Sequence, residues 1–189
     1  TFGYSLGIGL STSFTGEDSL AITLDAGNVT EGVAELDGNT TGDTLIVDGI
    51  SYTFPVAGAT VIVGDSTDGS ALFTTACAYG GPSAMLDDCG NVNAGITGGE
   101  ATIGASYDFG NGFTAATGFQ TSSTVKGVFT EESSDKYAFN AAYTADSYGV
   151  SLTYAVTENA GLTNEDTYTA ANAYYTPEGS LPSISVGYE

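Results

Sequence analysis

The sequence contains no histidine, arginine or tryptophan, and its only basic residues are Lys126 and Lys136. Without histidine, the Ser/His and Cys/His arrangements that activate most catalytic nucleophiles cannot form. Two basic residues against 23 acidic ones give a formal net charge of −21. Such a chain cannot make the cationic contacts that dominate nucleic-acid binding, so a nucleic-acid partner is excluded.

Adjacent carboxylates are the remaining candidates for catalysis. Asp87 and Asp88 form one such pair, and Glu131 and Glu132 form another. A pair of carboxylic acids can act as general acid and base. Both pairs lie in segments rich in Gly, Ser and Thr, where adjacent acids are typically solvated, so we expect no catalytic residues and no enzyme activity.

Long apolar runs are also missing, because no stretch approaches the ~18 residues of a membrane-spanning helix. The apolar residues are aromatic or short: the chain has 12 Tyr and 9 Phe beside 27 Gly, with one Met. Strands favour tyrosine, phenylalanine and β-branched residues, whereas helices gain little from them. Any contact with a membrane is therefore expected to be made by strands.

Only two cysteines occur, Cys77 and Cys89, in a segment rich in Gly, Asp and Ser. We expect a disulfide between them, formed in an oxidising compartment, with two free thiols as the alternative. Two thiols without a histidine make a poor metal site. The sequence therefore predicts a cross-linked loop and no resident cofactor.

Apolar and small polar residues alternate along most of the chain. In the first segment Phe2, Tyr4 and Leu6 alternate with Gly3 and Ser5, and the pattern continues to residue 11. A period of two is typical of a strand with one apolar and one polar face. Pro55 is expected to end the third strand. The same alternation predicts about ten strands, at 2–11, 20–25, 50–54, 61–63, 102–109, 113–120, 137–144, 148–156, 167–176 and 182–189.

Short and long connections alternate between these strands. In an antiparallel barrel every second connection emerges at the same rim, and outer-membrane barrels have tight turns at one rim and long loops at the other. The short connections are expected near 14–18, 55–58, 110–112, 146–147 and 177–181, and the long ones near 29–45, 66–100, 121–135 and 157–166. The pattern predicts an all-β antiparallel transmembrane β-barrel.

A water-soluble β-sandwich gives the same alternation, so it has to be weighed against a barrel. Charges are nearly absent from the apolar face, with Asp48 as the awkward exception, and aromatics recur near the strand ends, where interfacial girdles lie in membrane barrels. The opposite face is polar, as suits a wet lumen. These features favour the barrel. The candidates for lumen-facing residues are Thr23, Asp25, Thr102, Ser106, Asp108, Gln120 and Asn140.

The connection 66–100 is the best candidate for a functional element. If it folds into the lumen it would set the width of a pore and favour cations; the alternative is a loop on the outer surface. Its acids could also hold a Ca²⁺ ion, although their spacing matches no EF-hand loop. The candidates for the pore constriction are Asp65, Asp68, Asp87, Asp88 and Glu100.

Several segments resemble one known family. Ser51-Tyr-Thr-Phe-Pro-Val, Ala59-Thr-Val-Ile-Val-Gly, Gly104-Ala-Ser-Tyr-Asp-Phe-Gly-Asn-Gly-Phe and Leu10-Ser-Thr-Ser-Phe-Thr-Gly resemble the Som-type outer-membrane porins of cyanobacteria, most closely those of marine picocyanobacteria. That family is related to the OprB carbohydrate porins and is sometimes labelled as iron-uptake porins. The likeness covers nearly the whole chain.

The resemblance implies a larger, homotrimeric barrel in the outer membrane, preceded by a surface-layer-homology domain. Neither that domain nor the closing strands are in this sequence, so we expect residues 1–189 to be one segment of the barrel. The basic residues that line many porin eyelets have almost no counterpart here.

We therefore expect a porin that passes small hydrophilic solutes and ions, with a preference for cations, surrounded by outer-membrane lipid. The alternative function is that of a secreted, acidic, β-rich adhesin or surface-layer-like structural protein, which would need no lumen.

Overall fold

One antiparallel sheet contains all the strands of the computed structural model, which describes residues 3–29, 40–77, 93–122, 130, 133–159 and 165–189. Within these ranges there is no helix that is long and apolar enough to span a bilayer. The ten strands are β1 (Ser5–Thr12), β2 (Ser19–Gly27), β3 (Gly42–Val56), β4 (Ala59–Thr67), β5 (Gly99–Gly110), β6 (Phe113–Thr121), β7 (Asp135–Thr144), β8 (Tyr148–Glu158), β9 (Glu165–Tyr175) and β10 (Ile184–Tyr188).

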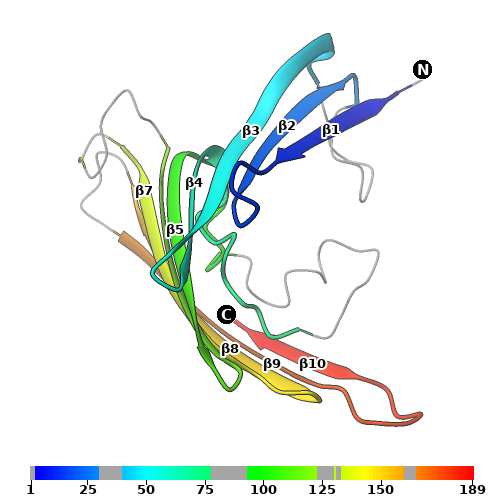
Figure 1. Ribbon diagram of the computed structural model, residues 1–189, viewed down its shortest axis with the longest axis vertical. Coiled ribbons are helices and arrows are strands. Elements are labelled where there is room, and N and C mark those ends of the chain that lie inside the picture. Colours follow the sequence, from blue (N-terminus) through cyan, green and yellow to red (C-terminus); the bar gives the residue numbers. More distant parts are fainter. Residues whose placement is uncertain (1–2, 30–39, 78–92, 123–129, 131–132, 160–164) are drawn as a thin grey trace.

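The sheet is a simple meander, because every strand pairs only with its neighbours in sequence. It is strongly curved, with one concave and one convex face (Figure 1). β1 and β10 form the two edges and do not pair with each other, so the sheet is open. The expected all-β fold of about ten antiparallel strands is confirmed.

The alternation of the sequence sorts the side chains between the two faces. In β8, Ser151 and Thr153 are buried while Val150, Leu152 and Tyr154 are exposed. The buried set lies on the concave side, which we call the inner face, and the exposed set lies on the convex side, the outer face. The same alternation continues in β7 and in most of β5 and β6.

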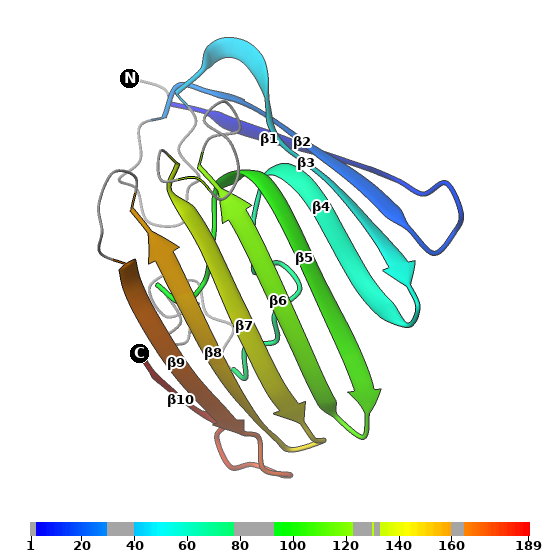
Figure 2. The same ribbon diagram turned by 90° about the vertical axis from the view of Figure 1, so that its left-hand side faces the viewer.

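The connections leave the sheet at two opposite rims, as expected for a meander (Figure 2). The rim with residues 13–18, 57–58, 111–112, 145–147 and 176–183 is called the short-turn rim. The alternation of short and long connections fails at the last pair, since 159–164 is shorter than 176–183. The reason is that β10 begins only at Ile184, after Pro182, which cannot donate a main-chain hydrogen bond.

The third strand is longer than expected and runs through Pro55, so the prediction that Pro55 ends it was wrong. Pro55 pairs with Thr60 of β4, and the strand continues to Val56. On its other side β2 begins at Ser19, opposite Thr53. Pro55 therefore lies beyond the end of β2, where no neighbouring strand needs its missing N–H.

Asp48 is the extra residue of a β-bulge in β3. Thr23 pairs with Gly49 while Leu24 pairs with Val47, so Asp48 has no partner in β2. A bulged residue leaves the regular alternation of the strand. The bulge accounts for an acid within an otherwise apolar set.

A tight hairpin joins β5 to β6 through Gly110, Asn111 and Gly112, all of which have positive φ angles. Glycine and asparagine adopt this conformation most readily, as the sequence motif predicts. At Gly112 a Cβ atom would also lie 2.1 Å from the carbonyl oxygen of Thr144. Only glycine fits there, which fixes the turn.

Candidate functional site

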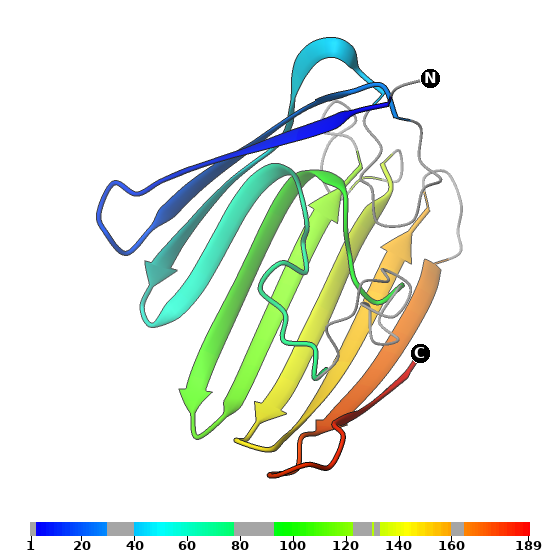
Figure 3. The ribbon, with the colours of Figure 1, turned by 90° about the vertical axis from the view of Figure 1, so that its right-hand side faces the viewer.

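The connection between β4 and β5 crosses the inner face of the sheet. Its described parts, residues 68–77 and 93–98, are called the inner segment. Figure 3 shows residues 68–77 passing in front of β5 to β8 on the concave side. The inner segment therefore lies inside the curve of the sheet. Of the two alternatives for residues 66–100, this position agrees with a loop that folds inward and not with a loop on the outer surface.

Asn140 of β7 holds the inner segment at its middle. The side-chain Oδ1 of Asn140 accepts a hydrogen bond from the Thr74 main-chain N (3.0 Å), and its Nδ2 donates to the Thr74 carbonyl oxygen (3.1 Å). The same Nδ2 donates to Thr153 Oγ1 of β8 (2.9 Å). Asn140 is only 4% exposed, and both main-chain polar groups of the half-buried Thr74 are hydrogen-bonded to it.

Gln120 of β6 also holds the inner segment, nearer the rim that lies opposite the short-turn rim. Its Oε1 accepts a hydrogen bond from Gly69 N (3.1 Å), and its Nε2 donates to the Thr97 carbonyl oxygen (2.7 Å). One buried carboxamide thus contacts both halves of the inner segment. Beside it, Thr102 Oγ1 donates to the carbonyl oxygen of Thr67, where β4 ends (2.8 Å).

Two further wall residues contact the inner segment towards β10. Ser151 Oγ of β8 accepts a hydrogen bond from Ala76 N (2.9 Å). The carboxylate of Glu189 accepts hydrogen bonds from Asn93 N (2.8 Å), Asn93 Nδ2 (2.9 Å) and Ala94 N (2.6 Å). The inner segment is therefore held from β6 as far as the residue that follows β10.

Two glycines on neighbouring strands let the backbone of the inner segment approach the sheet. A Cβ atom at Gly118 of β6 would lie 1.8 Å from the carbonyl oxygen of Gly69, and one at Gly104 of β5 would lie 3.3 Å from the same atom. Gly104 and Gly118 are directly paired. They form a flat patch on which the peptide group of Gly69 rests.

A small apolar cluster fills the space between the inner segment and β7 to β9. Ala94 and Ile96 of the segment are fully buried, and the sheet contributes Ala138, Ala155 and Ala170. Phe73 and Tyr168 pack against this cluster. Small alanines on the wall leave room for the segment, so it is packed as well as hydrogen-bonded.

The two halves of the inner segment are also tied to each other. Ser70 N and Ser70 Oγ both donate to the carbonyl oxygen of Ile96, at 3.2 and 3.1 Å. Gly98 N donates to Asp68 Oδ1 (3.0 Å). Cys77 takes part in a disulfide, and its expected partner, Cys89, lies outside the described residues.

The acids predicted for a constriction are not gathered at one place. Asp68 is exposed and ties the two halves of the inner segment together. Asp65 is exposed at the end of β4, two residues after the outward-facing Val63. Glu100 is exposed near the start of β5, and Asp87 and Asp88 lie outside the described residues. No group of three possible metal ligands occurs within the described ranges.

The candidates for lumen-facing residues all lie on the inner face by register, but they differ in surroundings. Thr102, Gln120 and Asn140 are buried because the inner segment covers them. Asp25 is also buried, whereas Ser106 is half-buried. Thr23 is exposed and donates to the Gly49 carbonyl oxygen, and Asp108 is exposed and accepts from Gly110 N. Two of the seven candidates, Gln120 and Asn140, thus hydrogen-bond to the inner segment.

The outer face has the opposite character, because its large apolar side chains are exposed. Phe139 is 55% exposed and Leu152 54%, while their inward-facing neighbours Asn140 and Thr153 are 4% and 0% exposed. In a soluble sandwich the apolar face would be covered by a second sheet. The described residues contain one sheet only, and the polar face is the covered one.

Aromatic side chains line the outer face along the short-turn rim, and we call them the rim belt. Their rings contact one another in sequence along the rim, with centroid distances between 4.7 and 6.1 Å. The contacts are Phe14 with Tyr52, Tyr52 with Phe54, Tyr107 with Phe109, Phe113 with Tyr143, and Tyr143 with Tyr148. Aromatic side chains gathered at one level are typical of the interfacial girdles of membrane barrels.

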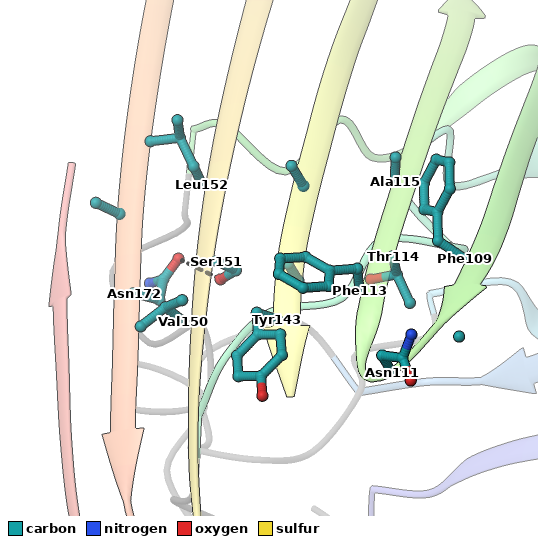
Figure 4. Close-up of a pocket in the computed structure, with 14 residues that line it drawn as sticks. Phe109, Asn111, Phe113, Thr114, Ala115, Tyr143, Val150, Ser151, Leu152 and Asn172 are labelled. Carbon is teal, nitrogen blue, oxygen red and sulfur yellow. Dashed lines mark hydrogen bonds between the residues drawn. The ribbon is translucent and has the colours of Figure 1, made fainter. Parts of the chain in front are cut away.

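Beside the rim belt, a shallow apolar groove runs across β5 to β9 (Figure 4). Ala115, Ala141 and Ala171 are among its lining residues, together with the larger Phe113 and Leu152. Ala115 pairs with Ala141, Ala141 with Leu152, and Leu152 with Ala171, so these residues form one row across the strands. The groove is a depression in the exposed apolar surface.

Comparison with known proteins gives no matching family model, no matching curated protein and no matching solved structure. The geometry of the two faces and of the inner segment is therefore what indicates a function. The contacts of Ser151, Glu189 and Gly118 were missed by sequence reasoning. Ser151 shares the alternating polar face with Asn140, which was the available signal, whereas no local pattern distinguishes Gly118 from other glycines.

Proposed function

We propose that this chain is part of the wall of a transmembrane β-barrel, and that the barrel is a passive diffusion channel of an outer membrane. The solutes are small hydrophilic molecules and ions, with cations favoured. The homotrimeric assembly that the family resemblance implies belongs to the same proposal.

The inverted polarity of the sheet is the observation that carries this proposal. Exposed leucine, valine and aromatic side chains cover the outer face, and buried threonine, serine and amide groups cover the inner one. Hydrocarbon is a favourable surrounding for the first set, and water or a polar segment for the second. The rim belt adds support, since tyrosine and phenylalanine gather where such a wall would leave the bilayer.

The position of the inner segment supports a channel with a constriction. A segment held inside the curve of the wall would fill part of the cross-section of the channel and leave the rest open. The inner face of β1 and β2 carries small residues such as Gly9, Ser11 and Thr23, together with the acid Asp25. A hydrophilic surface of this kind suits the passage of small solutes.

The test is electrical conductance across a planar lipid bilayer. The intact protein, purified in detergent, is expected to insert and to produce stepwise increases in current. The same detergent buffer without protein is the control. A protein that stays monodisperse in water without detergent and produces no current steps would overturn the proposal and favour the adhesin alternative.

A further inference from the structure

The inner segment is attached to the wall by side chains whose only visible task is to hold its backbone. We infer that Asn140 and Gln120 are positioning residues that fix the inner segment in place, and that Gly118 sets how far it stands from the wall. This inference rests on the proposed channel function, because it holds that these residues determine the width of the channel opening.

Asn140 presents the same two groups to Thr74 that a neighbouring strand would. A carboxamide has one acceptor and one donor side by side, as a peptide group does. Asn140 uses both on the main chain of Thr74, at 3.0 and 3.1 Å, and Thr153 orients the amide through a third hydrogen bond. Thr74 is thereby held as if it belonged to a strand, although it has no strand of its own.

Gln120 is the second attachment and acts on both halves at once. It accepts from Gly69 N and donates to the Thr97 carbonyl oxygen, and it is 3% exposed. Both carboxamides are thus buried and use donor and acceptor together. If Gln120 were shortened, the N–H of the buried Gly69 would lose its hydrogen-bond partner, which is costly. Shortening Asn140 would remove both hydrogen bonds from the half-buried main chain of Thr74.

The depth of the inner segment is set by the absence of a side chain at Gly118. A Cβ atom there would lie 1.8 Å from the carbonyl oxygen of Gly69, a distance that no structure tolerates. The contact involves backbone on one side, so a rotamer change cannot relieve it. Alanine at this position must push Gly69 away from the wall and into the opening.

Gly118→Ala is therefore expected to lower the unit conductance, by more than the spread between repeated wild-type recordings. Gly9→Ala is the matched control, because Gly9 lies on the inner face of β1 and a Cβ atom there would meet nothing within 4 Å. It is expected to conduct like the wild type. At Gly104 a Cβ atom would lie 2.9 Å from Ile62 Cγ2, a side-chain end, and 3.3 Å from the same Gly69 oxygen. Gly104→Ala should therefore give a smaller decrease, and it serves if Gly118→Ala fails to fold.

Asn140→Ala tests the attachment in a different way. We expect the open-channel current to fluctuate more strongly, because Thr74 loses both main-chain hydrogen bonds and the inner segment can move. Thr60→Ala is the control, since Thr60 lies on the inner face of β4 away from the inner segment. A purely structural role would change the yield of folded protein and leave the current of each inserted channel unaltered.

The outcomes separate the inference from the proposed function. If wild-type protein gives no current steps, the channel proposal fails. If it does conduct, but Gly118→Ala and Gly104→Ala match Gly9→Ala in unit conductance and Asn140→Ala matches Thr60→Ala in current noise, the positioning role is refuted and the channel proposal stands.

Discussion

At the scale of single residues, Asp18 accepts five hydrogen bonds. Its Oδ1 accepts from Ser13 Oγ (2.6 Å), Phe14 N (3.0 Å), and both N and Oγ1 of Thr15 (2.8 Å each), and its Oδ2 accepts from Tyr52 OH (2.6 Å). The bond from Ser13 is the largest influence on the pKa of Asp18, and with those from Tyr52 and Thr15 it holds that pKa far below the ordinary value of 3.8. Asp18 therefore closes the turn 13–18 and fastens it to the rim belt.

Replacement of Asp18 by asparagine is expected to destabilise the protein at pH 7. Because the folded pKa is lowered, the charged form of Asp18 contributes stability above about pH 4, and the contribution is lost as the pH falls below that value. The difference between wild type and Asp18→Asn should accordingly shrink in acid. Guanidinium unfolding titrations at several pH values would measure it, with Glu17→Gln, at the exposed neighbour, as the control. A difference that is independent of pH would contradict this account.

At the scale of the strand, a substitution on the outer face of β8 distinguishes a sheet that faces lipid from a sheet that faces water. Leu152 lies near the middle of β8 and is 54% exposed. In water, lysine at an exposed position changes stability little, typically within about 0.5 kcal/mol. In a bilayer, lysine near the midplane costs about 2 to 4 kcal/mol. Leu152→Lys is therefore expected to lower the free energy of unfolding by the larger amount when the protein is folded in lipid vesicles.

The matched control is Leu181→Lys. Leu181 is 68% exposed but lies in the connection 176–183 at the short-turn rim, where a basic residue costs at most about 1 kcal/mol in a membrane barrel. Both variants would be compared with wild type by denaturant titration from vesicles. Equal, small losses for the two variants would argue that the outer face meets water.

The strands themselves were predictable from the sequence for a local reason. Alternation with a period of two places residues such as Val150 and Ser151 on opposite faces wherever the chain is extended, and Gly110-Asn111-Gly112 favours a tight turn. The ends were less predictable, because they depend on neighbouring strands. Pro55 belongs to β3 since β2 stops short of it, and a single sequence does not contain that information.

The course of the inner segment could not be predicted, because its contacts join residues far apart in the chain. Thr74 and Asn140 are 66 positions apart, and Gly69 and Gln120 are 51 apart. Nothing in the segment's own periodicity indicates these partners. Gln120 and Asn140 were recognised as members of a polar face, but a polar side chain that meets water and one that grips a backbone look alike in the sequence.

At the scale of the whole molecule, the charge balance predicts selectivity for cations. The net charge is −21, and Lys136 is placed on the inner face by its pairing with Gln120. Reversal potentials measured across a potassium chloride gradient are expected to show cation preference. The preference should weaken at high salt, because the screening length falls from about 10 Å at 0.1 M to about 3 Å at 1 M.

Lys136→Gln is expected to increase that preference by removing a positive charge from the inner face. The control is Thr157→Gln, at the residue of β8 that pairs with Lys136. It introduces the same glutamine side chain as Lys136→Gln but does not change the charge, so the reversal potential should stay unaltered. A channel that prefers anions would contradict the charge argument, even if it conducts well.

The wall holds the inner segment mainly by its peptide groups: Gly69 N, Thr97 O, both main-chain groups of Thr74, and Ala76 N. Peptide groups are the same whatever amino acid carries them. Side chains of the segment that stay outside the apolar cluster can therefore change, proline excepted, without loss of these hydrogen bonds, so the surface that the segment displays is not dictated by the wall that holds it.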